Sequence, residues 1–444
     1  MFIRESPTPW HAVSSISSML KFSGYELFTV PSDKLNYKSF TIFNGSLIAI
    51  RKGQNSGDLN KPILIIAAHT DSPCLKLKPI SKQLASNGLL QLGVQTYGNG
   101  IWHSWFDRDL RISGTALVKE DNVCVEKLFM SNNAICTIPN VAIHLLRTQN
   151  DSFAVNKEIH LKPIFGMQEN DTESFDETGV SSSSIENRHD SHLIRKIGEM
   201  LGTSADCIID VDACLSDITK PAIGGSNDEF LFAPRLDNLS SCFSAIKALT
   251  STINEDCDVV VACFNHEEIG SQTDEGALTH RLYQILKHVG IDMDDRTVAN
   301  NCFIVSADAA HGFHPNFSEL YENVHRPKLD GGPVVKTNAN GRYATTMHSA
   351  NMIRQAAKLA SVPIQEFVMR NDMACGSTVG PFLASKYGIR TVDIGIPILS
   401  MHSIREMMAC NALSQFTKLL ESIIKNFNDL STKFVPHYAH NPIL

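Results

Sequence analysis

The sequence predicts an α/β fold in which helices cover both faces of a mostly parallel sheet. From residue 234 onwards, apolar runs typical of buried strands alternate with segments of helical spacing. Upstream, residues 62–68 (PILIIAA) are apolar throughout, as expected of a strand buried on both faces. Residues 76–206 differ, because short strand-like runs alternate there with Gly, Asn and Pro. We therefore expect one α/β domain built from residues 1–75 and 207–444, interrupted by a β-rich insert over 76–206.

The individual elements follow from local patterns. Val13, Ile16 and Leu20 lie at helical spacing behind Pro9 and predict an opening helix. Strands are expected at residues 46–51, 62–68, 89–94, 113–118 and 142–146, and the polar residues 168–191 are expected to form a surface loop. In the second half the expected helices are 236–249, 277–289, 348–360 and 411–427, and the expected strands are 257–264, 301–305 and 390–394.

Composition excludes several classes of protein. With 444 residues, 43% of them apolar, the chain can bury a large core, and its net charge of −8 argues against a nucleic-acid partner. Apolar stretches such as 63–68 are too short to span a membrane, and charges and prolines near the N-terminus argue against a secretory signal. Eleven cysteines without a Cys-x-x-Cys pair suit a reducing compartment, so we expect a cytoplasmic protein.

Five residues of metal-binding type occur at the ends or starts of predicted elements. His69, Glu268 and Asp308 each come shortly after a predicted strand, Asp237 opens a predicted helix, and His402 follows the apolar segment GIPILSM. Taken singly, each has a simpler explanation, since an Asp at a helix start is usually an N-cap and a lone His is usually structural. Ligands in such sheets bind beyond the carboxyl ends of the strands, so one pocket could collect all five.

The five residues suit a pair of zinc ions, because zinc binds imidazole nitrogen and carboxylate oxygen. We expect Asp237 to bridge the ions, with His69 and Asp308 on one and Glu268 and His402 on the other. Cobalt or manganese could occupy such mixed sites as well.

Two further carboxylates complete the predicted centre. Asp71 is placed to accept the second imidazole N–H of His69, and Glu267 is placed to act as the general base on a metal-bridging hydroxide. Competing motifs fail, since Gly270 stands where HExxH requires its second His and no GxSxG is present.

In this order, these residues resemble the aspartyl aminopeptidase family of dizinc exopeptidases over nearly the whole chain. The motifs that carry the resemblance include AAHTDSPCLKLKP (67–79), RLDNL (235–239), HEEIGS (266–271), SADAAHGFHPN (306–316), CGSTVGP (375–381) and MHSIRE (401–406). The resemblance implies a three-layer αβα zinc-exopeptidase domain with an inserted β-rich dimerisation domain. It also implies a homo-oligomer built from dimers, expected to be a dodecamer.

The resemblance implies an activity and its residues. Family members remove an N-terminal Asp or Glu from peptides and hold two zinc ions per subunit. Lys336 would pair with the acidic side chain of the substrate, and His311 would stabilise the oxyanion. The implied catalytic residues are Glu267, Asp71 and His311, the substrate-binding residues are Glu267, Asp308, His311, Lys336 and Tyr343, and the metal ligands are His69, Asp237, Glu268, Asp308 and His402.

One position departs from the eukaryotic-looking members of the family. Where those members carry a His that reaches the active site of a neighbouring subunit, this chain has Asn140. Asn can donate a hydrogen bond but carries no charge. The departure puts the contact between subunits in question and favours a bacterial-type member.

Two other functions stay open. One is a chambered dizinc aminopeptidase of other or broader specificity, which rates on peptides with different N-terminal residues would distinguish. The other is a non-catalytic assembly or cargo protein that retains the fold. The presence of Glu267 and of all five expected ligands disfavours the second.

Overall fold

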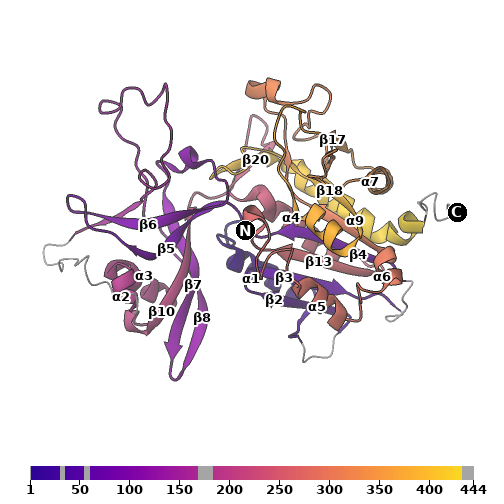
Figure 1. Ribbon diagram of the computed structural model, residues 1–444, viewed down its shortest axis with the longest axis horizontal. Coiled ribbons are helices and arrows are strands. Elements are labelled where there is room, and N and C mark those ends of the chain that lie inside the picture. Colours follow the sequence, from indigo (N-terminus) through magenta and orange to yellow (C-terminus); the bar gives the residue numbers. More distant parts are fainter. Residues whose placement is uncertain (1, 31–35, 55–60, 169–183, 433–444) are drawn as a thin grey trace. The chain divides into compact units, whose positions relative to one another are not determined.

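The chain folds into two compact units. The computed structural model describes residues 2–30, 36–54, 61–168 and 184–432. Unit 1 comprises Met1–Asp71, Ala222–Met401 and Glu406–Leu444, and unit 2 comprises Ser72–Pro221 and His402–Arg405 (Figure 1). Unit 2 thus begins before residue 76 and ends after residue 206, the limits expected of the insert. It does so because β10 (Ile208–Asp217) pairs along β7 (Leu110–Glu120) within the sheet of unit 2.

A nine-stranded mixed sheet forms the centre of unit 1. Its order is β1 (Glu26–Leu27), β2 (Lys38–Phe43), β3 (Ser46–Arg51), β13 (Asp258–Phe264), β4 (Ile63–His69), β14 (Cys302–Ala307), β18 (Arg390–Gly395), β16 (Val334–Lys336) and β17 (Gln365–Phe367). The four central strands, β13, β4, β14 and β18, run parallel to one another. Their carboxyl ends therefore meet at one edge of the sheet, which is where the predicted site residues follow.

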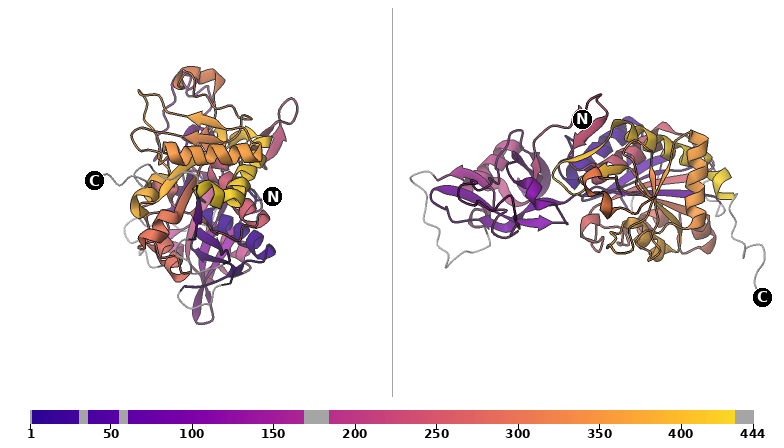
Figure 2. Two further views of the ribbon diagram at one scale, coloured as in Figure 1. Left: turned by 90° about the vertical axis from the view of Figure 1, so that its right-hand side faces the viewer. Right: turned by 90° about the horizontal axis from the view of Figure 1, so that it is seen from above.

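Helices cover both faces of this sheet, so the predicted α/β fold is confirmed (Figure 1). Along β4, Leu64 and Ile66 pack in one core, whereas Ile63 and Ile65 pack in the other. The first core includes residues of α1 (Pro9–Phe22), α4 (Leu236–Ser251), α7 (Met347–Ala360) and α9 (Cys410–Thr432). The second includes residues of α5 (Arg281–His288), α6 (Arg296–Asn301) and α8 (Val379–Tyr387). The alternation of side chains along each strand produces the three layers, which the turned views also display (Figure 2).

A smaller sheet of unit 1 carries the segments that follow the central strands. Its order is β11 (Ala222–Gly224), β12 (Phe230–Ala233), β20 (Glu406–Ala409), β19 (Pro397–Leu399) and β15 (Ala310–His311). β15 is the next strand after β14 along the chain. His311, which ends β15, therefore follows Asp308 by only three residues.

Unit 2 is built on a six-stranded antiparallel sheet. Its order is β8 (Val123–Met130), β7, β10, β5 (Cys74–Lys82), β6 (Leu89–Tyr97) and β9 (Ile164–Met167). Helices α2 (Ile185–Arg188) and α3 (Ser191–Leu201) contribute to its core, in which Trp102 and Trp105 are buried. The short 3-10 helices of the two units are η1 (Trp102–Trp105), η2 (Ala205–Cys207), η3 (Glu267–Ile269) and η4 (Pro315–Leu320).

One predicted element is wrong and another lies partly outside the described residues. Residues 142–146 do not form a strand. Residues 143–145 are a turn, all five residues are exposed, and no strand among the described residues pairs with them. Of the polar stretch 168–191, residues 169–183 lie outside the described residues, and the part that follows forms α2 and the start of α3.

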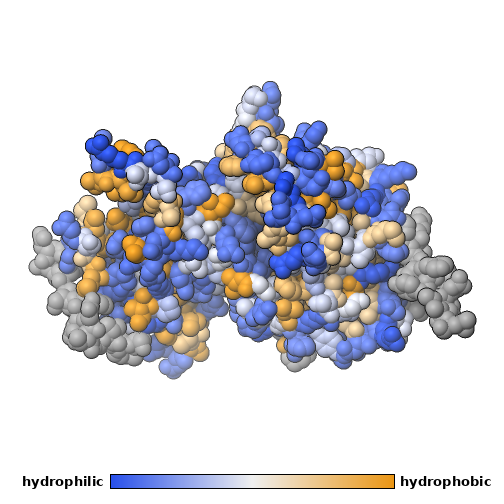
Figure 3. Space-filling view, turned by 45° about the horizontal axis from the view of Figure 1, so that its top comes forward, coloured by the Kyte–Doolittle hydropathy of each residue, from blue (hydrophilic) through white to orange (hydrophobic). Residues whose placement is uncertain are grey.

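Apolar residues are interspersed among polar ones on the face shown in Figure 3. Among the helices of the described residues, none combines the length and the apolar character that a membrane span requires.

Candidate active site

The parallel strands bring the predicted site residues of unit 1 together. His69 is the last residue of β4, and it lies opposite Phe264 at the end of β13. Glu267 and Glu268 follow β13 after a turn in which His266 has a left-handed backbone conformation, with φ of 63°. Asp308 comes one residue after β14, the other parallel neighbour of β4. The strand ends thus supply these side chains from neighbouring positions along one edge.

The imidazole of His69 lies at the centre of a carboxylate cluster. Its Nε2 is 3.3 Å from Asp237 Oδ1, 3.3 Å from Asp308 Oδ1 and 3.9 Å from Glu267 Oε2. One ligand atom each from His69, Asp237 and Glu268 lie within 4.8 Å of one another. The structure therefore brings all four predicted ligands of unit 1 and the predicted base into one place.

Asp71 connects the cluster to the turn that carries Glu267 and Glu268. Its Oδ1 accepts the backbone N–H of Glu267 at 3.2 Å, and its Oδ2 accepts that of Glu268 at 3.1 Å. His69 Nδ1 lies 3.1 Å from the backbone oxygen of Asp71 and 3.4 Å from its Oδ1. A proton on Nδ1 leaves Nε2 free to act as a ligand. The sequence predicted the bond to His69, but it did not indicate that Asp71 also fixes the backbone of η3.

The electrostatics of the cluster favour a positive charge at its centre. Burial opposes protonation of His69, but hydrogen bonds to Asp237, Asp308 and Asp71 outweigh burial and hold the pKa of the imidazole well above its ordinary value. Burial also raises the pKa of Glu267. The nearby carboxylates raise it further, because they add to the cost of its negative charge, while His69 opposes the shift. A set of imidazole nitrogen and carboxylate oxygen converging within a few ångströms suits a zinc ion. The residues present therefore fit the metal that the sequence predicts.

Glu406 holds the start of the segment that carries Asp237, and the sequence analysis assigned it no role. Its Oε2 accepts the backbone N–H of Asp237 at 3.0 Å, and its side chain is buried. The next residue, Asn238, donates from Nδ2 to the backbone oxygen of Ala307 at 2.8 Å. These two bonds fix Asp237 between β20 and the end of β14. The position of Glu406 in the segment MHSIRE, one of the motifs that carry the family resemblance, was the available sequence signal.

His402, the fifth predicted ligand, belongs to unit 2. Its Nδ1 lies 3.0 Å from the backbone oxygen of Asn99, and its backbone oxygen accepts the N–H of Ile101 at 2.8 Å. The backbone of His402 is left-handed, with φ of 66°. The bond at Nδ1 orients the ring, and the place of His402 in the ligand set stays a prediction.

Lys336 is a buried cation next to the cluster. Its side chain is only 3% exposed, and its Nζ donates to the backbone oxygen of Ala309 at 3.1 Å. The same nitrogen lies 3.6 Å from Asp308 Oδ2 and 5.2 Å from the centre of the Tyr343 ring. Tyr343 is itself buried, and burial raises the pKa of its hydroxyl. The structure thus places Lys336, Tyr343 and Asp308 close together, and their role in binding substrate stays a prediction.

Asp393 is a second buried charge in this region that the sequence analysis missed. It lies directly opposite Lys336 where β18 pairs with β16, and it is fully buried. Its Oδ2 accepts the backbone N–H of Ala344 at 2.6 Å. Burial raises the pKa of Asp393, while the charge of Lys336 opposes that shift. An Asp inside the apolar strand TVDIG was a signal for a paired internal charge.

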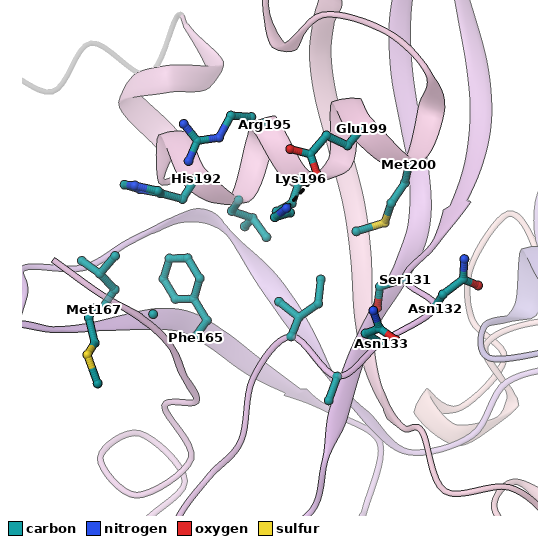
Figure 4. A pocket seen from close by; sticks show the side chains of 15 residues that line it. Ser131, Asn132, Asn133, Phe165, Met167, His192, Arg195, Lys196, Glu199 and Met200 are labelled. Atoms are coloured by element: carbon teal, nitrogen blue, oxygen red, sulfur yellow. Dashed lines mark hydrogen bonds and ion pairs between the residues drawn. The ribbon is translucent and has the colours of Figure 1, made fainter. Parts of the chain in front are cut away.

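A separate cavity of about 620 Å³ lies within unit 2. Figure 4 shows His192, Arg195, Lys196 and Glu199 along α3 on one side and Phe165 and Met167 of β9 on another. Lys196 Nζ pairs with Glu199 Oε2 at 2.7 Å. The residues that line this cavity include none of the predicted site residues.

Comparison with known proteins finds similarity over nearly the whole chain. Residues 2–423 match the family described as "Aminopeptidase I zinc metalloprotease (M18)". "Aspartyl aminopeptidase 4" of Saccharomyces cerevisiae is 38% identical over 98% of this chain and 95% of its own length. "Probable M18 family aminopeptidase 2" of Pseudomonas entomophila is also 38% identical, over 96% of each chain.

Solved structures with similar folds cover the same extent. A cryo-EM structure of an Ape4 and Nbr1 complex superposes with a TM-score of 0.92 at 37% identity, over 98% of this chain and 86% of that one. A structure of the S. cerevisiae mApe1 dodecamer has a TM-score of 0.85 at 30% identity, over 98% of this chain and 97% of that one.

Proposed function

The chain belongs to the M18 family of zinc metalloaminopeptidases, and we propose that it removes an N-terminal Asp or Glu from peptides with two zinc ions per subunit. The observation that carries the acidic specificity is Lys336, a buried cation whose Nζ lies 3.6 Å from Asp308 within the carboxylate cluster. An acidic substrate side chain would meet a positive charge there that is poorly screened by water.

The chain's own residues have distinct tasks in this proposal. His69, Asp237, Glu268, Asp308 and His402 would hold two zinc ions, which activate water and polarise the peptide carbonyl when bound. Glu267 takes the proton of the attacking water and passes it to the leaving amine. Its Oε2 lies 3.9 Å from His69 Nε2, so the carboxylate is within the cluster that would hold the metal-bound water.

Three more residues position the reaction. Asp71 bonds the backbone N–H groups of Glu267 and Glu268, so it fixes the base and a ligand relative to each other. His311 donates to the oxygen of the scissile carbonyl as negative charge develops on it, an interaction worth roughly 3–4 kcal/mol by comparison with known oxyanion donors. Tyr343 packs against Lys336 and limits where the acidic side chain can lie.

Unit 2 provides the dimer contact in this proposal, and the dimers assemble into a dodecamer. The similar mApe1 structure is a dodecamer, which supports a homo-oligomer. Val141, Ile143 and Leu145 are exposed in unit 2, so apolar side chains there could contact a second copy. Asn140 accepts from Gln149 Nε2 at 2.7 Å and donates to Asp107 Oδ2 at 2.6 Å. Both ends of its amide are therefore already used within the subunit.

We place the protein in the cytoplasm. All eleven cysteines are free thiols, and six of them are buried. Buried thiols persist in a reducing compartment, whereas an oxidising one favours disulfides.

A substrate panel tests the proposed function. We expect kcat/KM to be highest on peptides that begin with Asp or Glu and far lower on matched peptides that begin with Leu or Ala, with about two zinc ions bound per subunit in the same sample. Faster hydrolysis of the Leu peptides would favour a chambered aminopeptidase of other specificity. Failure to cleave any peptide with zinc bound would favour a non-catalytic role.

A further inference from the structure

An apolar cavity of about 250 Å³ lies beside His311 in unit 1. Residues of η4 and of the segment after β17 form most of its wall. Those that carry the argument are Phe317, Leu320, Phe367, Met369 and Met373. An apolar cavity of about 150 Å³ holds benzene in another protein, so this cavity can accommodate an aliphatic or aromatic side chain.

The cavity adjoins the residues proposed to hold the substrate. Phe367 lies opposite Lys336 where β17 pairs with β16, and its ring centre is 5.6 Å from that of His311. Lys336 is assigned to the first side chain of the peptide, and His311 to the carbonyl that follows it. In that assignment, the next side chain along the substrate would lie beyond His311, on the side where Phe367 and the cavity are.

The charged groups at the cavity are already paired. Arg370 forms two hydrogen bonds with Asp372, at 2.9 and 2.6 Å, and Glu322 pairs with His325 Nδ1 at 2.5 Å. His314 Nδ1 accepts the backbone N–H of Asn316. A charged side chain entering the cavity would lose water without gaining a free counter-charge. The two methionines add flexible, polarisable walls that adapt to different apolar shapes.

We propose that this cavity is the subsite for the second residue of the substrate and that it selects an apolar side chain there. The proposal rests on the proposed function, because the first residue and the scissile bond must lie as assigned above. The protein would then prefer peptides in which an acidic first residue is followed by an aliphatic or aromatic one.

The test compares peptides that differ only at the second residue. With the full-length zinc-loaded protein, kcat/KM for Asp-Leu-Ala and Asp-Phe-Ala should exceed that for Asp-Gly-Ala and Asp-Ser-Ala about tenfold or more, since each buried methylene contributes roughly fourfold. Phe317→Ala and Met373→Ala should each lower the Leu-to-Gly ratio at least threefold. Both residues are substantially exposed, at 50% and 38%, so their truncation should not prevent folding.

Matched controls use the same substitutions outside the cavity. Phe22→Ala and Met347→Ala, at side chains 96% and 74% exposed, should leave the Leu-to-Gly ratio unchanged. Equal rates on the Leu and Gly peptides, or a preference that neither cavity variant reduces, would overturn the proposal. If peptides beginning with Leu are cleaved faster than those beginning with Asp, the proposed acidic specificity fails. The subsite is then still decided by Leu-Leu-Ala against Leu-Gly-Ala.

Discussion

At the scale of single residues, each proposed chemical group depends on a neighbour that fixes it. Asp71 holds the backbone of Glu267 and Glu268, Glu406 holds that of Asp237, and Asp393 lies opposite Lys336. The sequence predicted the groups proposed to touch substrate or metal, because their residue types are those that such chemistry requires. It missed Glu406 and Asp393 because a buried carboxylate acquires its role only from the groups that fold against it.

Replacing the proposed base should stop turnover and keep the metal. Glu267→Gln removes the group that accepts a proton, while the imidazole and carboxylate ligands remain. We expect kcat on an Asp peptide to fall by roughly 10²–10⁴, with zinc content measured on the same sample unchanged. Glu319→Gln, at an exposed position, is the matched control and should leave both quantities as they were. A rate near that of the unsubstituted protein would show that Glu267 is not the base.

Replacing Lys336 should change selectivity more than metal binding. Lys336→Met keeps most of the side-chain length but removes the charge. A charge-assisted hydrogen bond contributes about 1.5–3 kcal/mol, so the ratio of kcat/KM for Asp over Leu peptides should drop at least tenfold at constant zinc content. The exposed Lys358→Met serves as the control. If the ratio stays constant in a variant whose melting temperature is preserved, Lys336 does not read the acidic side chain.

At the scale of elements, the edge at which parallel strands end decides where the site forms. β13, β4 and β14 pair in register, so the residues that follow each of them arrive side by side. The sequence predicted these strands because each is an apolar run with a clear boundary. It failed at residues 142–146, which stay exposed and pair with no strand of the part of the chain that the structure describes.

Acidification should destabilise unit 2 through His189, which follows α2. Its Nδ1 lies 2.8 Å from Ser81 Oγ, its Nε2 is buried with no hydrogen-bond partner among the described residues, and burial lowers its pKa to about 4. In the unfolded chain His189 has an ordinary His pKa near 6.5. Between about pH 6.5 and pH 4 the unfolded state therefore binds a proton that the folded state does not bind. Stability should therefore fall as the pH drops from about 6.5 to about 4.

The measurement is the melting temperature between pH 7 and pH 4. His189→Gln cannot titrate, so its melting temperature should fall less over that range than that of the unsubstituted protein. His103→Gln, at an exposed position, should show the unsubstituted slope. Identical slopes for His189→Gln and the unsubstituted protein would count against the buried neutral imidazole.

At the scale of the whole molecule, the net charge of −8 opposes an acidic substrate. In the proposed function the attraction must be local. Lys336 and the metal ions that the cluster would hold could supply it, because charges in a buried site are screened less than charges on the surface. Composition excluded a nucleic-acid partner, but it could not indicate the sign of charge that the site prefers.

Removing the metal should affect both activity and stability. Exhaustive chelation should abolish hydrolysis and lower the melting temperature, because the carboxylates around His69 then repel one another and the stabilisation by a bound ligand is lost. Adding zinc should restore both. Full activity with less than about a tenth of a metal ion per subunit, measured on the same sample, would contradict a metal-dependent reaction.

The sequence by itself determined the α/β layering, the position of each central strand and the identity of the residues that end them. These features are local, since hydrophobic period and residue type are readable in a short window. Only the tertiary structure decided the limits of unit 2, the membership of His402 in it, and the pairing of Lys336 opposite Asp393. Those features depend on contacts between segments far apart in the chain, where long-range strand pairing and burial, rather than local pattern, set the energy.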